Sequence, residues 1–510
     1  MTPGPVDRRP GPWLQPRSAT GLRPVECVVV ALAAVAGARV ALPVPTPVTV
    51  ALVAVGAALA VGLTTGASLV RSSLPVASSE WRHRVGHRHV AVALVALATG
   101  AVTSGSAERD LSELTPVGSF EVDEEVLLVG DPRPRGPGRT VDVEVGGRRL
   151  EASFFGPPAG AVAPSAMGER LHVVGSVRPF DEPWSGHVSR RVVGRLEVEQ
   201  AWGRRAASGV LGAANDFRTA MRSGLASLEE DRRAIALGVT IGDDRDLSPA
   251  ARDDFRVAGL SHLTAVSGQN VAFVIAVTAS LLRRRGRWTR LTVLAGVLVW
   301  FGFVTRWEPS VLRSIATAGL VLVVQPDPSP RARAATLGVA AAGLLVAYPL
   351  LAWSVGFQMS VAATAGIVAL AGPLERVLPG PRILRQALAV TLAAQIGVAP
   401  VQAFVFGVPS PVAVPANLLA GPAAGALMIT AGAGAVAAWL LPEAAALVTV
   451  PANLLAAWLL AVADQAAASA GWPWWRASVV VACSLAWWRL RNVRLGPPVS
   501  TDTPGPAVGS

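Results

Sequence analysis

Apolar windows of about 20 residues recur along this chain and constrain its fold more than any other feature. A helix needs about 20 apolar residues to cross about 30 Å of hydrocarbon. Windows of this kind lie near residues 25–43, 46–70, 89–105, 259–282, 291–305, 309–325, 333–349, 353–372, 386–406, 412–441, 446–468 and 476–489. A backbone in lipid must satisfy its own hydrogen bonds, so these windows predict spanning helices. We therefore expect a polytopic α-helical membrane protein with about 12 spans.

The composition agrees with this fold class. Of the 510 residues, 52% are hydrophobic and 15% are charged, which is too apolar for a soluble protein of this length. The formal net charge of +11 comes from arginine, because the sequence contains no lysine. A basic balance is compatible with a nucleic-acid partner, but arginine also collects in the cytoplasmic loops of membrane proteins. We favour the second interpretation, so the charge alone does not identify a partner.

Arginine clusters orient the predicted spans. They lie before the first window, between the second and third windows, and in most of the longer loops after residue 282. All of them fall on one side if each window crosses the membrane once, and the positive-inside rule makes that side cytoplasmic. The tails, residues 1–24 and 490–510, are then inside. Residues 25–109 form three spans that begin with an uncleaved anchor, and residues 259–489 form about nine.

The segment between these two sets of spans is predicted to lie outside the membrane and to contain a β domain, residues 110–205. Residues 140–145 alternate polar and apolar side chains as a half-buried strand does. Further strands are predicted at residues 122–129, 148–155, 169–178 and 188–199, with glycine-rich turns between several of them. This number of short strands suits a small β-barrel of the OB type, although a fragment of a three-layer sandwich would give a similar pattern.

Residues 206–258 are predicted to be amphipathic and connecting helices. Leu211, Phe217, Met221, Leu225 and Leu228 recur near helical spacing with charged residues around them. Such a helix either lies at the membrane interface or packs against the β domain. The stretch 236–244 is only moderately apolar and ends in charge, so it is not counted as a span.

A polar string enters one of the apolar windows at residues 259–274. It carries His262, Ser267, Gly268, Gln269 and Asn270. Counted along a continuous helix from residue 259, the last four lie about 12 to 17 Å deep, near the middle of the hydrocarbon. Two interpretations are open. Either the helix is interrupted here and the string lines a wet path, or Gly268 allows close helix packing across which the amides form hydrogen bonds.

Other polar groups interrupt later windows. Arg313 lies one turn inside its window, where it either snorkels in a structural role or pairs with Arg306 and Glu308. Uncharged groups at comparable positions are Gln358, Gln395 and Asn417. The window 412–441 carries two prolines, which predicts a broken or re-entrant helix. A path with few fixed charges suits a polyanion that must be released after each contact, although a transporter of sugars or peptides could use the same groups.

The sequence contains no recognisable catalytic constellation. It lacks a phosphate-binding loop, a nucleophile elbow and paired carboxylates, so we expect no catalytic residue and no enzyme activity. The histidines form no ligand set for a metal, and the two cysteines, Cys27 and Cys483, lie in apolar windows at opposite ends of the chain. Neither a metal nor a cofactor is predicted.

Six strings, taken in order, resemble the ComEC family, the inner-membrane channel of bacterial DNA uptake. They lie at residues 242–244, 258–268, 309–313, 356–366, 394–400 and 417–422, and the resemblance extends over residues 110–485. It implies a bacterial cell-membrane channel that passes single-stranded DNA into the cytoplasm during natural transformation. The path would be lined by His262, Ser267, Gly268, Gln269, Asn270, Arg313, Gln358, Gln395 and Asn417.

The same resemblance implies partners and a second DNA contact. The channel would be embedded in membrane lipid. It would work with a membrane-anchored DNA receptor, a separate nuclease and a cytoplasmic ATP-driven motor. An OB-like domain outside the membrane could hold single strands by stacking and charge. Its candidate residues are Arg178, Phe180, Trp184, Arg190, Arg191 and Arg195. A hydrophobic barrel core explains the aromatic residues among them equally well.

The sequence departs from the family pattern at two points. Many members carry histidine at the position of Asn270, so a role for a titrating imidazole is not carried over. Many also carry a C-terminal metallo-β-lactamase-like domain, which we expect to be lacking here, so nuclease activity is not assigned. Two alternatives stay open: a secondary transporter of another polar solute, and an envelope scaffold that transports nothing.

Overall fold

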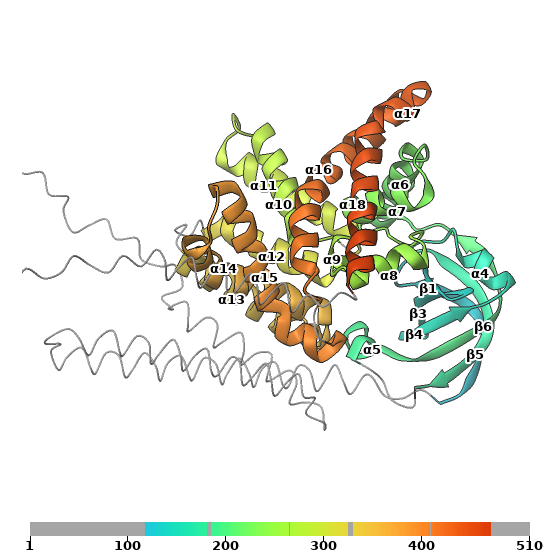
Figure 1. Ribbon diagram of the computed structural model, residues 1–510. Helices are drawn as coiled ribbons and strands as arrows, with labels where there is room; N and C mark the ends of the chain where they lie inside the picture. Colours follow the sequence, from blue (N-terminus) through green and yellow to red (C-terminus); the bar gives the residue numbers. More distant parts are fainter. Residues whose placement is uncertain (1–117, 181–184, 265, 325–329, 408–409, 471–510) are drawn as a thin grey trace, which may run out of the picture.

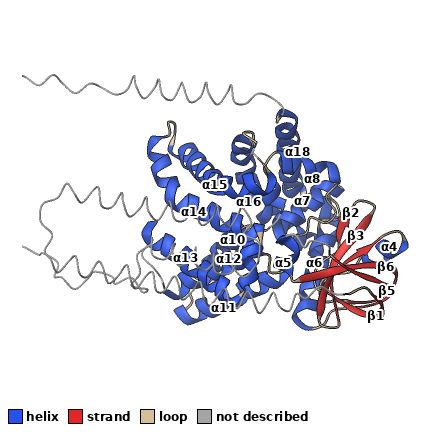
Figure 2. Ribbon diagram, turned by 90° about the horizontal axis from the view of Figure 1, so that it is seen from below, coloured by secondary structure: helices blue, strands red, loops and turns tan. Residues whose placement is uncertain are grey.

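Figure 1 shows the computed structural model of the protein. The structure describes residues 118–180, 185–264, 266–324, 330–407 and 410–470. The three predicted N-terminal spans, the window 476–489, both tails and Trp184 lie outside the described residues. Within them, a β domain lies at one side of a larger helical part (Figures 1 and 2).

The β domain is one sheet of six strands with two short helices inserted. Its elements are β1 Phe120–Leu128, β2 Arg133–Arg135, β3 Gly138–Val145, β4 Arg148–Phe154, α4 Pro157–Val162, β5 Arg170–Pro179, α5 Ser185–Arg190 and β6 Val192–Arg205. The strand order is β1-β5-β6-β4-β3-β2, and β1 also pairs with β3. Only the β4–β6 pairing is parallel. As the alternation predicts, Val141, Val143 and Val145 of β3 point into the core.

One predicted strand begins too early. Residues 188–199 were expected to be extended, but Val188 belongs to α5 and the strand begins at Val192. The cause is tertiary packing, because Val188 is buried in an apolar cluster that includes Leu345 and Trp353 of the helical part. A β-branched residue that favours a strand locally is thus held in a helical turn by its partners. Helix α5 accordingly lies between the sheet and the helices (Figure 1).

Helices account for the rest of the described chain. They are α6 Gly209–Gly224, α7 Glu230–Ile241, α8 Pro249–Val257, α9 Ser261–Thr264, α10 Gly268–Leu281, α11 Arg287–Val304, α12 Pro309–Val324, α13 Pro330–Ala347, η1 Pro349–Trp353, α14 Val355–Val377, α15 Arg382–Phe406, α16 Ala413–Leu440, η2 Pro442–Ala444, α17 Ala445–Val448 and α18 Val450–Ser469. Among the described residues, α11, α14, α15, α16 and α18 are long and apolar enough to cross a membrane. Helices α10, α12 and α13 contain shorter apolar segments, Gly268–Leu281, Pro309–Leu322 and Ala332–Ala347. The helical part is therefore compatible with a membrane-embedded protein.

The window 412–441 does not break, contrary to the prediction. It forms the continuous helix α16, with Pro422 in its interior. Pro415 lies in the first turn, where the missing N–H would have had no helical acceptor. Gly421 precedes Pro422, and nothing lies within 4 Å of a Cβ atom placed on this glycine. Apolar helices tolerate such a proline because neighbouring helices and local adjustments compensate for the lost bond.

The predicted amphipathic helix exists as α6, whose apolar side chains contact the helical part and, at Leu211, also Gly168 of the β domain. Met221 and Leu225 are buried in the main apolar cluster, which α7, α8, α16 and α18 share. A Cβ atom on Gly224 would lie 2.5 Å from the carbonyl oxygen of Ala435, so α6 and α16 touch through their backbones. Residues 234–241 of α7 are all buried, which fits a core helix too short to span.

Candidate functional site

The helix of the polar string is interrupted, as one of the two interpretations requires. Helix α9 ends at Thr264 and α10 begins at Gly268, and we call the segment between them the α9–α10 break. The depth of about 12 to 17 Å assumed a continuous helix from residue 259 and therefore does not apply. The residues from Ser267 to Asn270 instead form the N-terminal end of α10, whose N-cap is Ser267.

Several polar atoms at this break form hydrogen bonds with other parts of the protein, as the interpretation of close helix packing requires. Asn270 is buried, and its Nδ2 donates a hydrogen bond of 2.5 Å to the carbonyl oxygen of Val239 in α7. The hydroxyl of Ser310 donates to the carbonyl oxygen of Val266 at 2.7 Å. Ser267 Oγ lies 3.2 Å from Asn270 Oδ1, to which it donates. Asn270 thus locks α10 onto α7, whereas His262 and Gln269 remain exposed.

Arg313 lies against the start of α10 from the neighbouring helix α12. A Cβ atom added to Gly268 would lie 2.8 Å from Arg313 Nη2 and 2.8 Å from Ser314 Oγ. Arg313 is 6% exposed and donates to the hydroxyls of Ser360, at 2.7 Å, and Ser314, at 2.8 Å. The expected pairing of Arg313 with Arg306 and Glu308 is wrong, because Arg306 binds elsewhere and Glu308 forms no ion pair with Arg313 among the described residues.

The other predicted path residues are spread over the helical part. Asn417 reaches the polar string, since its Nδ2 donates to the carbonyl oxygen of Gly259 at 3.4 Å and to that of Ala413 at 2.7 Å. Gln358 is buried and donates to the carbonyl oxygen of Ala352 at 2.6 Å. Gln395 is half-buried on α15. The structure therefore groups Ser267, Gly268, Asn270 and Arg313, adds Asn417 at the edge, and separates Gln358.

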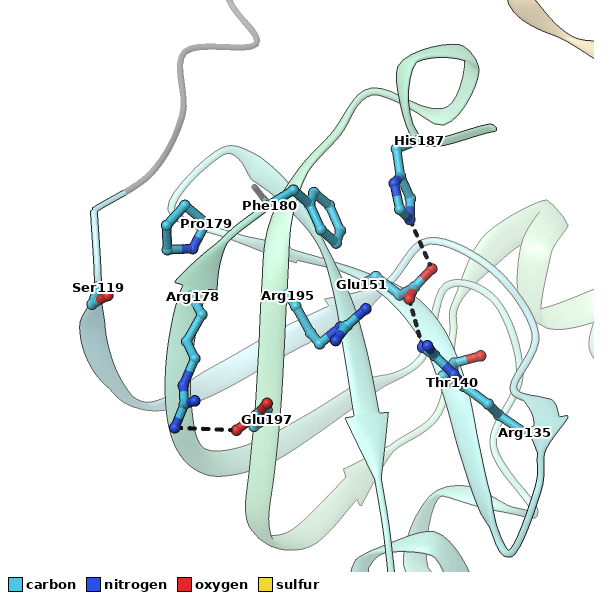
Figure 3. A pocket seen from close by; sticks show the side chains of 10 residues that line it. All are labelled: Ser119, Arg135, Thr140, Glu151, Arg178, Pro179, Phe180, His187, Arg195 and Glu197. Atoms are coloured by element: carbon cyan, nitrogen blue, oxygen red, sulfur yellow. Dashed lines mark hydrogen bonds and ion pairs between the residues drawn. The ribbon is translucent and has the colours of Figure 1, made fainter. Parts of the chain in front are cut away.

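The β domain contains a cavity of about 780 Å³ (Figure 3). Its lining residues come from the residue before β1, from β2 to β4, and from the end of β5, α5 and the first half of β6. They are Ser119, Arg135, Thr140, Glu151, Arg178, Pro179, Phe180, His187, Arg195 and Glu197. Glu151 accepts a hydrogen bond from Arg135 at 2.9 Å and lies 3.5 Å from His187. Arg178 pairs with Glu197 at 3.5 Å on the exposed side. Arg195 Nε is buried without a hydrogen-bond partner among the described residues.

The aromatic ring of Phe180 in the cavity contacts two other lining side chains, His187 and Arg195. The Phe180 ring is stacked on His187 with centroids 4.0 Å apart, and the Arg195 guanidinium lies 5.8 Å from the Phe180 centroid. Burial lowers the pKa of His187, so this ring is neutral at pH 7. Burial acts to raise the pKa of Glu151, but the hydrogen bond from Arg190 and the positive charges around the carboxylate together outweigh burial and hold that pKa below its usual range.

Of the predicted contacts on the β domain, Arg178, Phe180 and Arg195 line the cavity. Arg190 is close to it but is neutralised by Asp142 and Glu151. Arg191 is exposed, with a left-handed φ of 60°.

A buried ionic cluster joins the β domain to the helical part, and sequence reasoning missed it. Its members are Asp131, Asn215, Arg218, Arg222, Asp243, Arg245, Asp246 and Arg306, which we call the junction cluster. Asp131, from the β1–β2 turn, accepts from Arg218 at 2.9 Å and from Arg306 at 2.9 Å. Asp243 follows α7 and binds Arg222 at 2.7 Å. The one signal in the sequence was the spacing of Arg218 and Arg222, four residues apart on one helix face.

Charges of opposite sign keep this cluster ionised. Burial alone would raise the pKa of Asp131, but the guanidinium groups of Arg218, Arg306 and Arg245 lower it well below its usual range. The same balance lowers the pKa of Asp243. Arg306 reaches Asp131 from a tight turn in which Arg306 and Trp307 adopt left-handed φ angles of 60° and 52°. Such angles cost about 1–3 kcal/mol each and persist only where the surrounding structure holds them.

Glu308 lies beside the junction cluster and titrates near neutrality. Burial raises its pKa from 4.5 to about 7. The charges of Arg133 and Arg218 oppose this rise, and the charge of Asp244 adds to it. A carboxyl group whose pKa is raised by folding stabilises the folded state at pH values below its pKa in the unfolded chain. This contribution is lost as the pH rises through about 7.

We therefore expect Glu308→Gln to remove a pH dependence of stability. From about pH 5 to about pH 8, the wild-type free energy of unfolding should fall relative to the variant by up to about 3 kcal/mol, at about 1.4 kcal/mol per pKa unit. Thermal unfolding of both proteins in lipid nanodiscs at several pH values measures the difference. A constant difference across this range would contradict the raised pKa.

No group of three or more histidine, cysteine, aspartate or glutamate side chains in the described part of the chain could hold a metal ion.

The elements described so far are those of a helical protein, compatible with a membrane protein, that has an inserted β domain and a polar helix break. The profile of the competence protein family matches residues 239–494, about half of the chain, beginning inside α7 and including the α9–α10 break and Arg313. The chain therefore belongs to the competence protein family, and the resemblance to the ComEC type is confirmed. Neither a curated protein nor a solved structure matches the chain.

Proposed function

We propose that this protein is a cell-membrane channel that passes single-stranded DNA into the cytoplasm during natural transformation. The observation that carries the proposal is the family match, because it covers the α9–α10 break and the helices that contact it. The path runs past the exposed side chains of His262 and Gln269 and the buried guanidinium of Arg313. Gln395 and Asn417 contribute further polar groups, and Gln358 supports the start of α14.

The β domain is proposed to be an OB-type barrel that presents the single DNA strand to the channel. Two observations support this assignment: the pairings run β1–β5–β6–β4–β3 and back to β1, and β4 and β6 are parallel. OB domains bind single strands at the loops between their first two and last two strands. Here the corresponding connections are β1–β3, which includes the short strand β2 and contributes Arg135 to the cavity, and β5–β6, which contributes Phe180 and His187 (Figure 3).

Both loops that flank the cavity are fixed to the helical part. The first loop carries Asp131, which is bound by Arg218 and Arg306 in the junction cluster. The second carries α5, whose Val188 is buried against Leu345 and Trp353. This double attachment supports a fixed position of the cavity beside the channel helices. We place the β domain outside the cell membrane and both termini inside.

The channel itself is proposed to perform no catalysis. A membrane-anchored DNA receptor would deliver the duplex, a separate nuclease would remove one strand, and a cytoplasmic ATP-driven motor would pull the other.

Deletion of the gene in a naturally transformable host tests this function. We expect transformation by added DNA to be abolished while binding of DNA to the cell surface persists, and a plasmid copy of the wild-type gene to restore uptake. Unchanged transformation in a strain whose competence is verified would overturn the proposal.

A charge test on the cavity follows from its geometry. Arg178→Gln with Arg195→Gln should lower the affinity of the full-length protein in nanodiscs for a dT20 oligonucleotide. If each arginine neutralises one phosphate, the slope of log affinity against log salt should become shallower by about 1.4, at about 0.7 per phosphate on a single strand. Fluorescence anisotropy at several salt concentrations measures both quantities.

The matched control is Arg148→Gln, because Arg148 is exposed at the start of β4 and does not line the cavity. It should leave the salt dependence unchanged. Equal effects of the two changes would mean that oligonucleotides respond to net charge and not to this cavity.

A further inference from the structure

Arg313 carries a buried positive charge that has no acidic partner among the described residues. The side chain is 6% exposed, and its hydrogen bonds within the described residues go to neutral hydroxyl groups, those of Ser360 and Ser314. None of the ion pairs among the described residues includes Arg313, in contrast to Arg218 and Arg306 of the junction cluster. Burial of an uncompensated charge is costly, so a charge kept in this way calls for a ligand of opposite sign.

A second positive group lies directly beside it. The guanidinium is so close to the first turn of α10 that a Cβ atom on Gly268 would lie 2.8 Å from Arg313 Nη2. This turn is the N-terminus of a helix of 14 residues, and the Ser267 side chain does not cap it. The helix dipole places partial positive charge at that end, which disfavours a neighbouring cation and favours an anion.

The groups around this point match the chemistry of a phosphate. A guanidinium can donate two parallel hydrogen bonds to phosphate oxygens, and free amide groups of a first helical turn can donate more. The hydroxyls of Ser314 and Ser360 hold the guanidinium from two helices, α12 and α14, so its position is fixed before a ligand arrives. Ser310 holds the backbone of the α9–α10 break through the carbonyl of Val266.

We propose that Arg313 and the first turn of α10 form a binding site for one phosphate group, and that its occupant is a phosphate of the DNA strand on its way through the channel. The identity of the occupant rests on the proposed function, whereas the anion site itself does not. A single site of this kind holds one phosphate at a time, which is compatible with stepwise passage of a strand.

The test uses the full-length protein in nanodiscs of phosphatidylcholine, with the midpoint of thermal unfolding as the readout. A ligand that binds the folded state raises this midpoint. Inorganic phosphate and dT20 should each raise it for the wild type beyond the effect of chloride at equal ionic strength. Arg313→Gln should lose the phosphate shift and weaken dT20 binding by about tenfold or more, and Arg313→Lys should retain part of both. The matched control Arg284→Gln, in the exposed loop after α10, should keep both shifts.

Absence of a phosphate shift in the wild type, or an equal shift in Arg313→Gln, would overturn the site. Nanodiscs with phosphatidylglycerol separate a lipid headgroup from the strand: if anionic lipid alone produces the Arg313-dependent shift and dT20 adds nothing, the assignment to DNA is overturned. Normal transformation by cells that carry Arg313→Gln would overturn that assignment too. Failure of the channel proposal is distinguishable from failure of the anion site. In that case the gene deletion would leave transformation unchanged, while phosphate would still raise the unfolding midpoint of the purified protein.

Discussion

Replacement of Asp131 by asparagine is expected to lower the free energy of unfolding by about 3–5 kcal/mol. Asp131 accepts hydrogen bonds from Arg218 and Arg306 and lies 3.6 Å from Arg245. An asparagine would leave these buried guanidinium groups with a neutral partner, and removal of one member of a buried ion pair leaves an uncompensated charge. Unfolding by heat or denaturant in nanodiscs measures the loss, and limited proteolysis between the β domain and α6 should become faster.

The control for this change is Asp123→Asn. Asp123 also belongs to the β domain and pairs with a side chain, His172, at 2.8 Å, but its own side chain is 74% exposed. Exposed pairs contribute about 0–1 kcal/mol, so this variant should unfold almost as the wild type does. Similar losses for both variants would contradict a special role of the junction cluster. Since the pKa of Asp131 is lowered, its stabilisation is present above about pH 4 and is lost as the pH falls through the folded value.

Gly366→Ala is expected to lower the free energy of unfolding by about 1–3 kcal/mol. Gly366 of α14 faces Gly397 of α15, and an added Cβ would lie 2.3 Å from the carbonyl oxygen of Ala393 and 2.9 Å from the Gly397 Cα. These are backbone atoms that cannot move aside alone, so the two helices must separate. The midpoint of thermal unfolding in nanodiscs reports the cost.

Gly372→Ala is the matched control on the same helix, because nothing lies within 4 Å of a Cβ at that position. Alanine is the better helix former, so this variant should be unchanged or more stable by up to about 1 kcal/mol. A functional consequence distinguishes the pair as well. Helix α14 carries Ser360, which holds Arg313, so separation of α14 from α15 should reduce DNA uptake for Gly366→Ala only.

Local patterns predicted much of the fold. The alternation at residues 140–145 predicts β3, and the apolar windows between residues 259 and 468 coincide with helices of the described chain. Predictions from local patterns fail where a contact between residues far apart in the sequence decides the conformation. Val188 favours a strand but is buried against Leu345 in a helical turn, and the prolines of α16 favour a break that the neighbouring helices prevent.

The candidate site was predicted in part for the same reason. A polar residue in an apolar window is energetically unfavourable in lipid and is therefore a candidate functional residue. For this reason Ser267, Asn270 and Arg313 could be selected from the sequence alone. Their partners could not be selected. Asn270 binds the backbone of Val239, and Arg313 binds Ser360, which is 47 positions away in the chain.

The sequence by itself determined that the chain has apolar windows, a β segment of alternating pattern and a polar string at residues 259–274, because hydropathy and periodicity are properties of neighbouring residues. Only the tertiary structure decided that Asp131 joins the β domain to the helical part and that Arg313 lies beside the start of α10 with no acid bound to it in the described part of the chain. Charge pairing acts between atoms about 3–4 Å apart whatever their separation in the chain, so the fold decides which charges are compensated and which one is left for a ligand.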